Sequence, residues 1–162
     1  MQSEQKSWIT QAGYRALTNE YERLWHIERP RITQEVSEAA AQGDRSENAE
    51  YIYGKKRLRE IDRRLRFLAD RLKRVEIYNT PQNNNLNIVF FGCVVSLFDT
   101  DTQKQVHYRI VGSDEIDLKK NWISVESPLG QAVLNKKIGH SVLVSRPKGD
   151  TEFIIHAIKP YP

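Results

Sequence analysis

The chain has 162 residues, of which 39% are hydrophobic and 28% are charged, enough for one compact domain or two small ones and too apolar for disorder throughout. No stretch approaches the roughly 20 apolar residues of a membrane span, and residues 1–7 lack the apolar core of a secretory signal, so we expect a soluble cytoplasmic protein. Cys93 is the only cysteine, which excludes an internal disulfide and a cysteine-rich zinc site, and the formal net charge of +4 is mild.

The first predicted helix begins near Thr10, a suitable N-cap, and continues with apolar residues at spacings of three and four. Pro30 lies inside this pattern and should remove a backbone hydrogen bond and kink the helix. Gly43 is a suitable C-terminal stop, so the helix should run to about Gln42. Its ~33 residues would be about 50 Å long.

The second predicted helix has the a and d pattern of a coiled coil without interruption. Its apolar positions are Leu58, Ile61, Leu65, Leu68, Leu72 and Val75. Only residues 43–45 separate the two helical stretches, so they should fold back as an antiparallel hairpin. An ordinary two-helix layer packed on the later domain is the alternative, but so narrow an apolar seam favours a projecting arm over residues 1–78.

The second helix also concentrates positive charge. From Lys55 to Arg74 there are ten basic residues and three acidic ones, a local charge of +7. With Leu58 at position a, basic residues occupy the g and b positions in two rows. The g row is Arg57, Arg64 and Arg71, and the b row is Arg59, Arg66 and Lys73. A solvated helix normally mixes signs, so the imbalance indicates an anionic partner, nucleic acid first and an acidic membrane surface second. Contact would be with backbone phosphates rather than bases.

Residues 79–87 are polar, contain a proline and have no period, which is typical of a linker. A second domain should then cover residues 88–162, with strands near 88–98, 105–111, 122–125, 141–145 and 152–158. Ser127 followed by Pro128 predicts the start of a short helix through Leu134. Cys93 lies in an apolar strand pattern and should be buried and inert. The predicted fold class is therefore α+β, a helical coiled-coil hairpin followed by a domain with a twisted antiparallel sheet and a short helix.

Two carboxylates, Asp44 and Glu47, lie three positions apart where the second helix should begin. One interpretation is a capping box, in which Asp44 accepts from the amide of Glu47 and Glu47 reaches back; composition favours it. The other is a pair of oxygen ligands for a hard cation such as Mg²⁺, which proteins often hold by only one or two carboxylates. The two interpretations are compatible, and two carboxylates are too few to make a hydrolase alone.

Other chemistry is not evident in the sequence. The four histidines, His26, His107, His140 and His156, are scattered without ligand spacing. We find no glycine-rich phosphate loop, no nucleophile elbow and no zinc signature. An autonomous active site is therefore not expected.

The segment Gly43-Asp44-Arg45-Ser46-Glu47-Asn48-Ala49-Glu50-Tyr51 resembles the signature of the bacterial Gre transcript cleavage factors. The stretch from Lys55 to Arg64 resembles the basic segment of the GreB type in particular. The similarity continues through Glu28-Arg29-Pro30, through residues 108–116 and through residues 123–129, so it covers the chain from about Ile9 to its end. Gly54, which costs ~1 kcal/mol in a helix relative to alanine, and the asparagine-rich linker depart from the family pattern.

The resemblance implies an arm and an FKBP-like domain that docks at the rim of the secondary channel of RNA polymerase, with Glu126, Ser127 and Pro128 as candidate contacts. Their alternative role is the helix start described above. The implied function is to stimulate the polymerase's own cleavage of backtracked RNA, so the chain would not itself be an enzyme. Asp44 and Glu47 would help hold a Mg²⁺ ion shared with the polymerase, while the isolated monomer would bind no cofactor.

The basic residues would contact the extruded RNA 3′ segment; they are Lys55, Lys56, Arg57, Arg59, Arg63, Arg64, Arg66 and Arg71. Two other functions stay open at the level of sequence. An inhibitory regulator could block the same channel without promoting cleavage, although the intact tip motif favours a cleavage factor. A free RNA-binding coiled coil would explain the basic rows but not the acidic tip.

Overall fold

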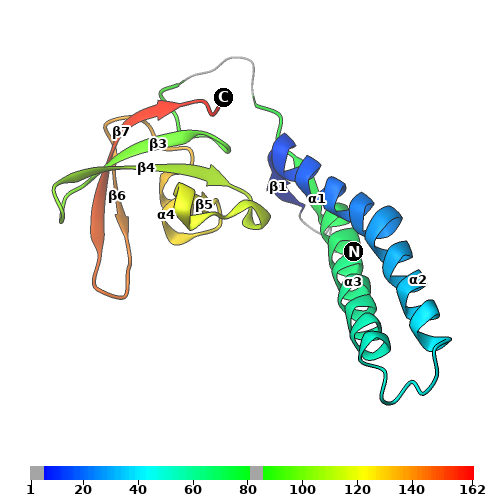
Figure 1. Cartoon of the computed structure of the whole chain (residues 1–162). Helices are drawn as coiled ribbons and strands as arrows, with labels where there is room; N and C mark the ends of the chain where they lie inside the picture. The colour runs from blue at the N-terminus through cyan, green and yellow to red at the C-terminus, as the bar shows by residue number, and fades with distance from the viewer. Residues whose placement is uncertain (1–5, 81–85) are drawn as a thin grey trace, which may run out of the picture. The chain divides into compact units, whose positions relative to one another are not determined.

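The computed structural model describes residues 6–80 and 86–162 (Figure 1). Tyr14–Val75 form one compact unit, and Lys6–Gly13 together with the described part of Glu76–Pro162 form another. Residues 6–13, expected in the arm, pack with the second unit because the Thr10 amide and hydroxyl both donate to the Glu115 carboxylate. Most of the predicted linker, residues 81–85, lies outside the described residues. Among the described residues, none of the helices could span a lipid bilayer.

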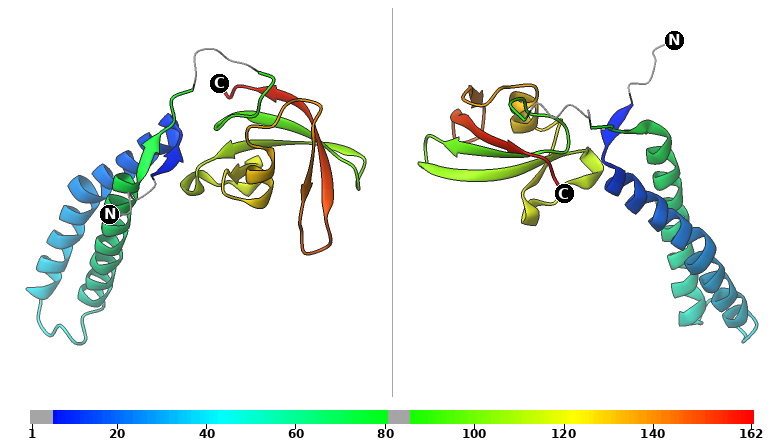
Figure 2. Two further views of the ribbon diagram at one scale, coloured as in Figure 1. Left: turned by 180° about the vertical axis from the view of Figure 1, so that it is seen from behind. Right: turned by 90° about the horizontal axis from the view of Figure 1, so that it is seen from above.

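The first unit is an antiparallel helical hairpin. Its elements are α1 (Gln11–Arg23) from Tyr14 on, the π-helical turn η1 (Leu24–Glu28), α2 (Arg29–Ala40) and α3 (Ala49–Arg74). Figure 2 shows α2 and α3 side by side from behind and from above. The predicted seam is confirmed, because the apolar positions of α3 face those of the first helix and are buried; they include Leu24, Ile32, Ala39, Ile61, Leu65 and Leu68.

The kink predicted at Pro30 takes the form of the π turn. The Arg29 N–H donates to the Leu24 carbonyl, five residues back, where an α-helix would use the fourth residue back. Pro30 has no N–H to donate, so the regular pattern could not have continued through it. The wider turn therefore removes the conflict while the helix continues as α2.

Gly54, an apparent defect in α3, lies at the contact between the helices. It is buried and occupies the d position one heptad before Ile61. A Cβ atom at this position would lie 2.5 Å from the Val36 Cγ2 atom of α2, closer than nonbonded carbons can approach. The glycine thus allows the two helices to come together near the tip of the hairpin.

The second unit contains a two-stranded and a five-stranded sheet. Strands β1 (Ser7–Ile9) and β2 (Val75–Ile77), which the sequence pattern did not indicate, pair with each other. The larger sheet has the order β5-β4-β3-β7-β6. Its strands are β3 (Val94–Asp99), β4 (Lys104–Val111), β5 (Trp122–Ser124), β6 (Ser141–Val144) and β7 (Thr151–Lys159).

Three helical segments complete this unit: η2 (Ser113–Glu115), η3 (Leu118–Lys120) and α4 (Pro128–Val133). Side chains from α4 join those of the sheet in a single apolar core that includes Leu97, Ile110, Val133, Phe153 and Ile155. Cys93 lies in this core, and burial raises the pKa of its thiol to about 11, which disfavours the reactive thiolate. The predicted α+β fold class is confirmed.

Two details of the predicted sheet are wrong. The strand expected over residues 88–98 begins only at Val94, and before it only Ile88 makes a bridge, to Lys137. The sheet is also not wholly antiparallel, because β4 and β5 run parallel with Ile110 opposite Ile123. A parallel pair needs a crossover, and here η2 and η3 supply it within a short connection.

Candidate functional site

The loop at the tip of the hairpin, residues 41–48, is closed by Asn48. The Oδ1 atom of Asn48 accepts from the Tyr51 amide at 3.0 Å and thereby caps α3. Its Nδ2 atom donates to the Ala39 carbonyl at 2.8 Å, near the end of α2. The capping box predicted for Asp44 and Glu47 is therefore wrong, because α3 begins at Ala49, later than the spacing suggested.

Asp44 instead braces the loop before the helix. Its Oδ1 atom accepts from the Ser46 amide at 2.9 Å and from the Ser46 hydroxyl at 2.8 Å, the geometry of an Asx turn. These two hydrogen bonds hold the pKa of the Asp44 carboxyl below its ordinary value, and the one from the Ser46 amide has the larger effect. An exposed, ionised carboxylate therefore stands on a loop whose own hydrogen bonds fix its position.

Glu47 is exposed on the same loop, which gives the tip two carboxylates that face solvent. In residues 6–80 and 86–162 there is no group of three or more acidic, histidine or cysteine side chains placed to hold a metal. Two carboxylates fit a Mg²⁺ ion whose remaining ligands come from water or another molecule. Asp44 and Glu47 are the tip residues that could supply such ligands.

The basic residues of α3 divide into two groups. In the g row, the Arg64 Nε and Nη2 atoms donate to the Glu20 carboxylate at 2.6 and 2.8 Å. Arg57 donates to Glu28, with its Nε atom at 3.0 Å from Oε1, and these bonds lower the pKa of the Glu28 carboxyl. Arg57 and Arg64 therefore bind the first helix of the hairpin rather than standing free.

Several other basic residues of α3 are not engaged in this way. Lys55, Lys56, Arg59, Arg63 and Arg66 are exposed and form no ion pair with any residue of the described ranges. Arg59 and Arg66 belong to the b row, on the other side of the seam from the g row. Lys73, in the last turn of α3, is likewise exposed and has no ion pair within the described ranges, so these six side chains carry the exposed, unpaired positive charge of α3.

In the second unit, Ser127 caps α4 as the sequence predicted. Its Oγ atom accepts from the Gly130 amide at 3.1 Å and donates to the Ser124 carbonyl at 2.6 Å, and Pro128 occupies the first turn. Glu126 is exposed, and its Oε2 atom accepts from the Ser113 hydroxyl at 2.9 Å. Of the three candidate docking residues, Glu126 and Pro128 are therefore exposed, while Ser127 is half-buried.

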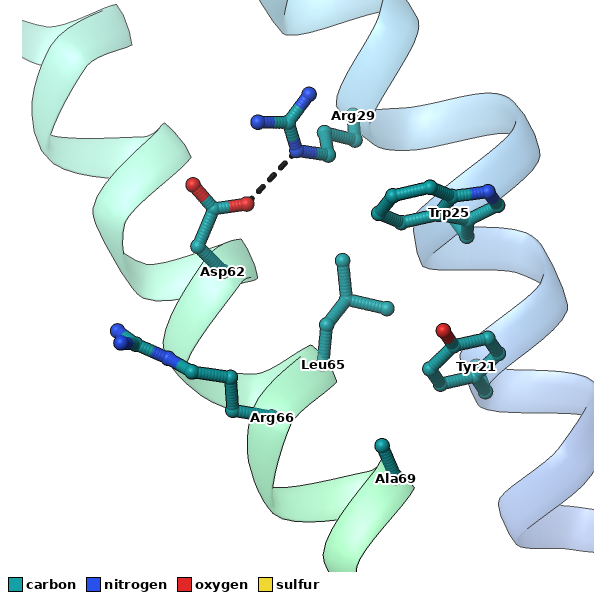
Figure 3. Close-up of a pocket in the computed structure, with 7 residues that line it drawn as sticks. All are labelled: Tyr21, Trp25, Arg29, Asp62, Leu65, Arg66 and Ala69. Atoms are coloured by element: carbon teal, nitrogen blue, oxygen red, sulfur yellow. Dashed lines mark hydrogen bonds and ion pairs between the residues drawn. The ribbon is translucent and has the colours of Figure 1, made fainter.

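A cavity of about 400 Å³ beside η1 was not indicated by the sequence (Figure 3). Tyr21 and Trp25 line it from the first helix, and Leu65 and Arg66 line it from α3. The signal in the sequence is an aromatic pair at i, i+4 that belongs to the apolar pattern of the first predicted helix. Such a pair normally packs into a core, so its exposure could not be read from spacing alone.

The two units correspond to the two halves of one class of protein, the transcription elongation factors. Residues 7–77 match the family model described as "Transcription elongation factor, N-terminal". Residues 82–160 match "Transcription elongation factor, GreA/GreB, C-term". The chain therefore belongs to the GreA/GreB family of transcription elongation factors.

Individual relatives agree with this assignment. The chain is 52% identical over 145 residues to "Transcription elongation factor GreB" of Pasteurella multocida, covering 88% of this chain and 89% of the relative. It is 50% identical over 154 residues to the protein of that name from Haemophilus ducreyi, covering 94% and 93%. Among solved structures, the GreA factor homolog Gfh1 of Thermus thermophilus is 26% identical, with a TM-score of 0.43, covering 94% of this chain and 98% of that one.

Proposed function

We propose that this chain binds RNA polymerase and stimulates the polymerase's own endonucleolytic cleavage of backtracked RNA, and so rescues arrested elongation complexes. The observation that carries this function is the tip loop, where two carboxylates are exposed and hydrogen bonds from Ser46 lower the pKa of Asp44. The names of the curated relatives support an elongation factor and do not favour an inhibitory regulator.

The tip carboxylates act as ligands. Asp44 and Glu47 would hold a Mg²⁺ ion together with groups of the polymerase, and such an ion activates water for phosphodiester hydrolysis. The contribution of this chain is positional. The Asx turn fixes Asp44 within the loop, and Asn48 fixes the loop to both helices, so little ordering remains to be done when the tip meets its target.

The second unit supplies the docking surface. In this proposal it binds the rim of the polymerase secondary channel through Glu126 and Pro128, while Ser127 keeps α4 in place. The protein acts as a monomer in the cytoplasm, and its hairpin enters the channel. The unpaired cations, above all Arg59, Arg63 and Arg66, contact the phosphates of the extruded RNA 3′ segment. Arg57 and Arg64 stabilise the hairpin on which those cations are mounted.

The test uses stalled, backtracked polymerase that carries end-labelled RNA. Adding the full chain should shorten the transcripts and allow them to be re-extended, whereas the chain alone should cut no RNA. Asp44→Asn keeps an oxygen that can accept from Ser46 but removes the charge, so it should abolish stimulation while polymerase binding is retained. Glu47→Gln should do the same.

Glu50→Gln is the matched control, because Glu50 is an exposed carboxylate in the first turn of α3 that lies outside the tip loop. It should keep wild-type stimulation. If Asp44→Asn and Glu47→Gln both cleave at the wild-type rate when Mg²⁺ is limiting, the tip carboxylates do not serve as ligands and the proposed function loses its basis.

A further inference from the structure

The cavity beside η1, called the slot below, is lined by two nearly parallel aromatic rings. The ring centroids of Tyr21 and Trp25 lie 6.5 Å apart and their planes differ by 13°. Figure 3 shows the rings one above the other, with the Leu65 side chain reaching toward them from α3. A nucleobase can stack on the face of such a ring, because every base has a flat π-face.

The slot is open to solvent and is built into the helix. The Trp25 side chain is 48% exposed although it is large and apolar. The two aromatic residues are four positions apart on either side of the start of η1, so the π turn contributes to their spacing. Tyr21 is half-buried. Accessible aromatic side chains are surfaces on which proteins stack the bases of single-stranded nucleic acid.

The charges around the slot suit an anion. Asp62 is the only acidic residue that lines the cavity, and the Arg29 Nε atom donates to its Oδ1 atom at 2.7 Å, so its charge is compensated. Arg66 lines the same cavity without an ion pair among the described residues. Arg59 lies one heptad toward the tip, about 10.5 Å along the helix axis. Flat apolar faces and unpaired cations therefore occur together here.

We infer that Tyr21 and Trp25 form a stacking slot for one base of single-stranded RNA, and that Arg66 contacts a phosphate next to that base. The inference rests on the proposed function, for which it supplies a binding site on the extruded transcript. Every base has a flat face, so the slot accepts any sequence. RNA held in it would be fixed in position by a contact that phosphate binding alone does not provide.

The position of the slot sets the length of RNA that can use it. Arg66 lies 17 residues beyond Ala49, the first residue of α3, so the slot is about 26 Å from the tip loop. A transcript extruded by two or three nucleotides would end near the tip. Only a longer segment would reach the slot, which therefore serves deeply backtracked complexes.

The experiment measures binding of the full chain to a fluorescent single-stranded RNA of about ten nucleotides, and to a strand of the same length that lacks its bases. Polymerase is absent. Wild-type protein should prefer the intact strand. Trp25→Leu should weaken binding to the intact strand by about fivefold or more and leave binding to the abasic strand unchanged. Trp25→Phe keeps a ring and should retain most of the preference.

Two further variants separate stacking from charge. Arg66→Gln should weaken binding to both strands alike and reduce the slope of log affinity against log salt concentration by about 1. Phe67→Leu is the matched control, because Phe67 is an aromatic residue of α3 that is 46% exposed but lies beside Arg64, away from the slot. It should bind both strands as the wild type does. Circular dichroism verifies that each variant keeps its helices.

The inference is overturned if Trp25→Leu binds the intact strand as tightly as wild type, or if it loses the same affinity for both strands. Loss of polymerase affinity with unchanged RNA binding would make the slot a protein contact and would also overturn it. The cleavage assay is separate. A protein that distinguishes the two strands but does not stimulate cleavage would refute the proposed function alone, and the reverse result would refute the slot alone.

Discussion

Replacing Gly54 by alanine should reveal how closely the two helices of the hairpin pack. In an unhindered helix this change stabilises by ~1 kcal/mol, because alanine loses less conformational entropy than glycine. Here the new methyl group would meet the Val36 Cγ2 atom at 2.5 Å, and an overpacked contact of this kind costs about 1–3 kcal/mol. The sum predicts that Gly54→Ala leaves the free energy of unfolding unchanged or lowers it by up to ~2 kcal/mol, whereas helix propensity alone predicts an increase.

The decisive measurement repeats the change in a Val36→Ala background. Removing Cγ2 removes the clash, so Gly54→Ala should now stabilise the hairpin by ~1 kcal/mol. The change of effect between the two backgrounds corresponds to a coupling of about 1–3 kcal/mol between contacting residues. Urea unfolding followed by circular dichroism at the helical band measures all four proteins. A stabilisation of ~1 kcal/mol by Gly54→Ala in both backgrounds would show that the helices are not in close contact at this point.

Two further changes test the hydrogen bonds of the hairpin. Asn48→Ala should lower the free energy of unfolding by ~1 kcal/mol, because it removes the cap of α3; Asp44→Ala, which removes no cap, should change it by less than ~0.5 kcal/mol. Urea unfolding of the two variants compares them, and equal losses would contradict the assignment of the cap. Glu28→Gln should cost ~1 kcal/mol at neutral pH, because hydrogen bonds from Arg57 and then Arg23 lower the pKa of this carboxyl. That difference should be fully present above the ordinary carboxyl pKa of 4.5 and vanish as the pH falls through the lower pKa of the folded state, so a difference that persists in strong acid would refute the ion pairs as its source.

The parts of the fold that repeat locally could be predicted from the sequence. The seam from Leu58 to Val75 repeats the same apolar spacing over several turns, and this repetition makes the helix prediction secure. Ser127 and Pro128 predict a helix start because cap and proline act within one turn of each other. In both cases the residues that determine the structure are neighbours in the chain.

The missed features depend on residues far apart in the chain or on small differences in energy. Asp44 and Asn48 are both good caps, and the choice between them depends on the carbonyl of Ala39 in the other helix, which Asn48 can donate to and Asp44 cannot. The g row looked free because Glu20 and Glu28, its partners, lie 44 and 29 residues away from Arg64 and Arg57. Three-residue strands such as β1 and β2 are too short to show a period.

The side chain of Asn48 has a consequence for how such a protein can change over time. One amide group closes both helices of the hairpin, since its oxygen caps α3 and its nitrogen holds the end of α2. The residues between these two anchors contribute nothing to the seam, so substitutions there can alter the chemistry of the tip without unravelling its support. The helices of the hairpin can therefore support different tip loops, and residues 41–47 can be replaced while Asn48 is kept.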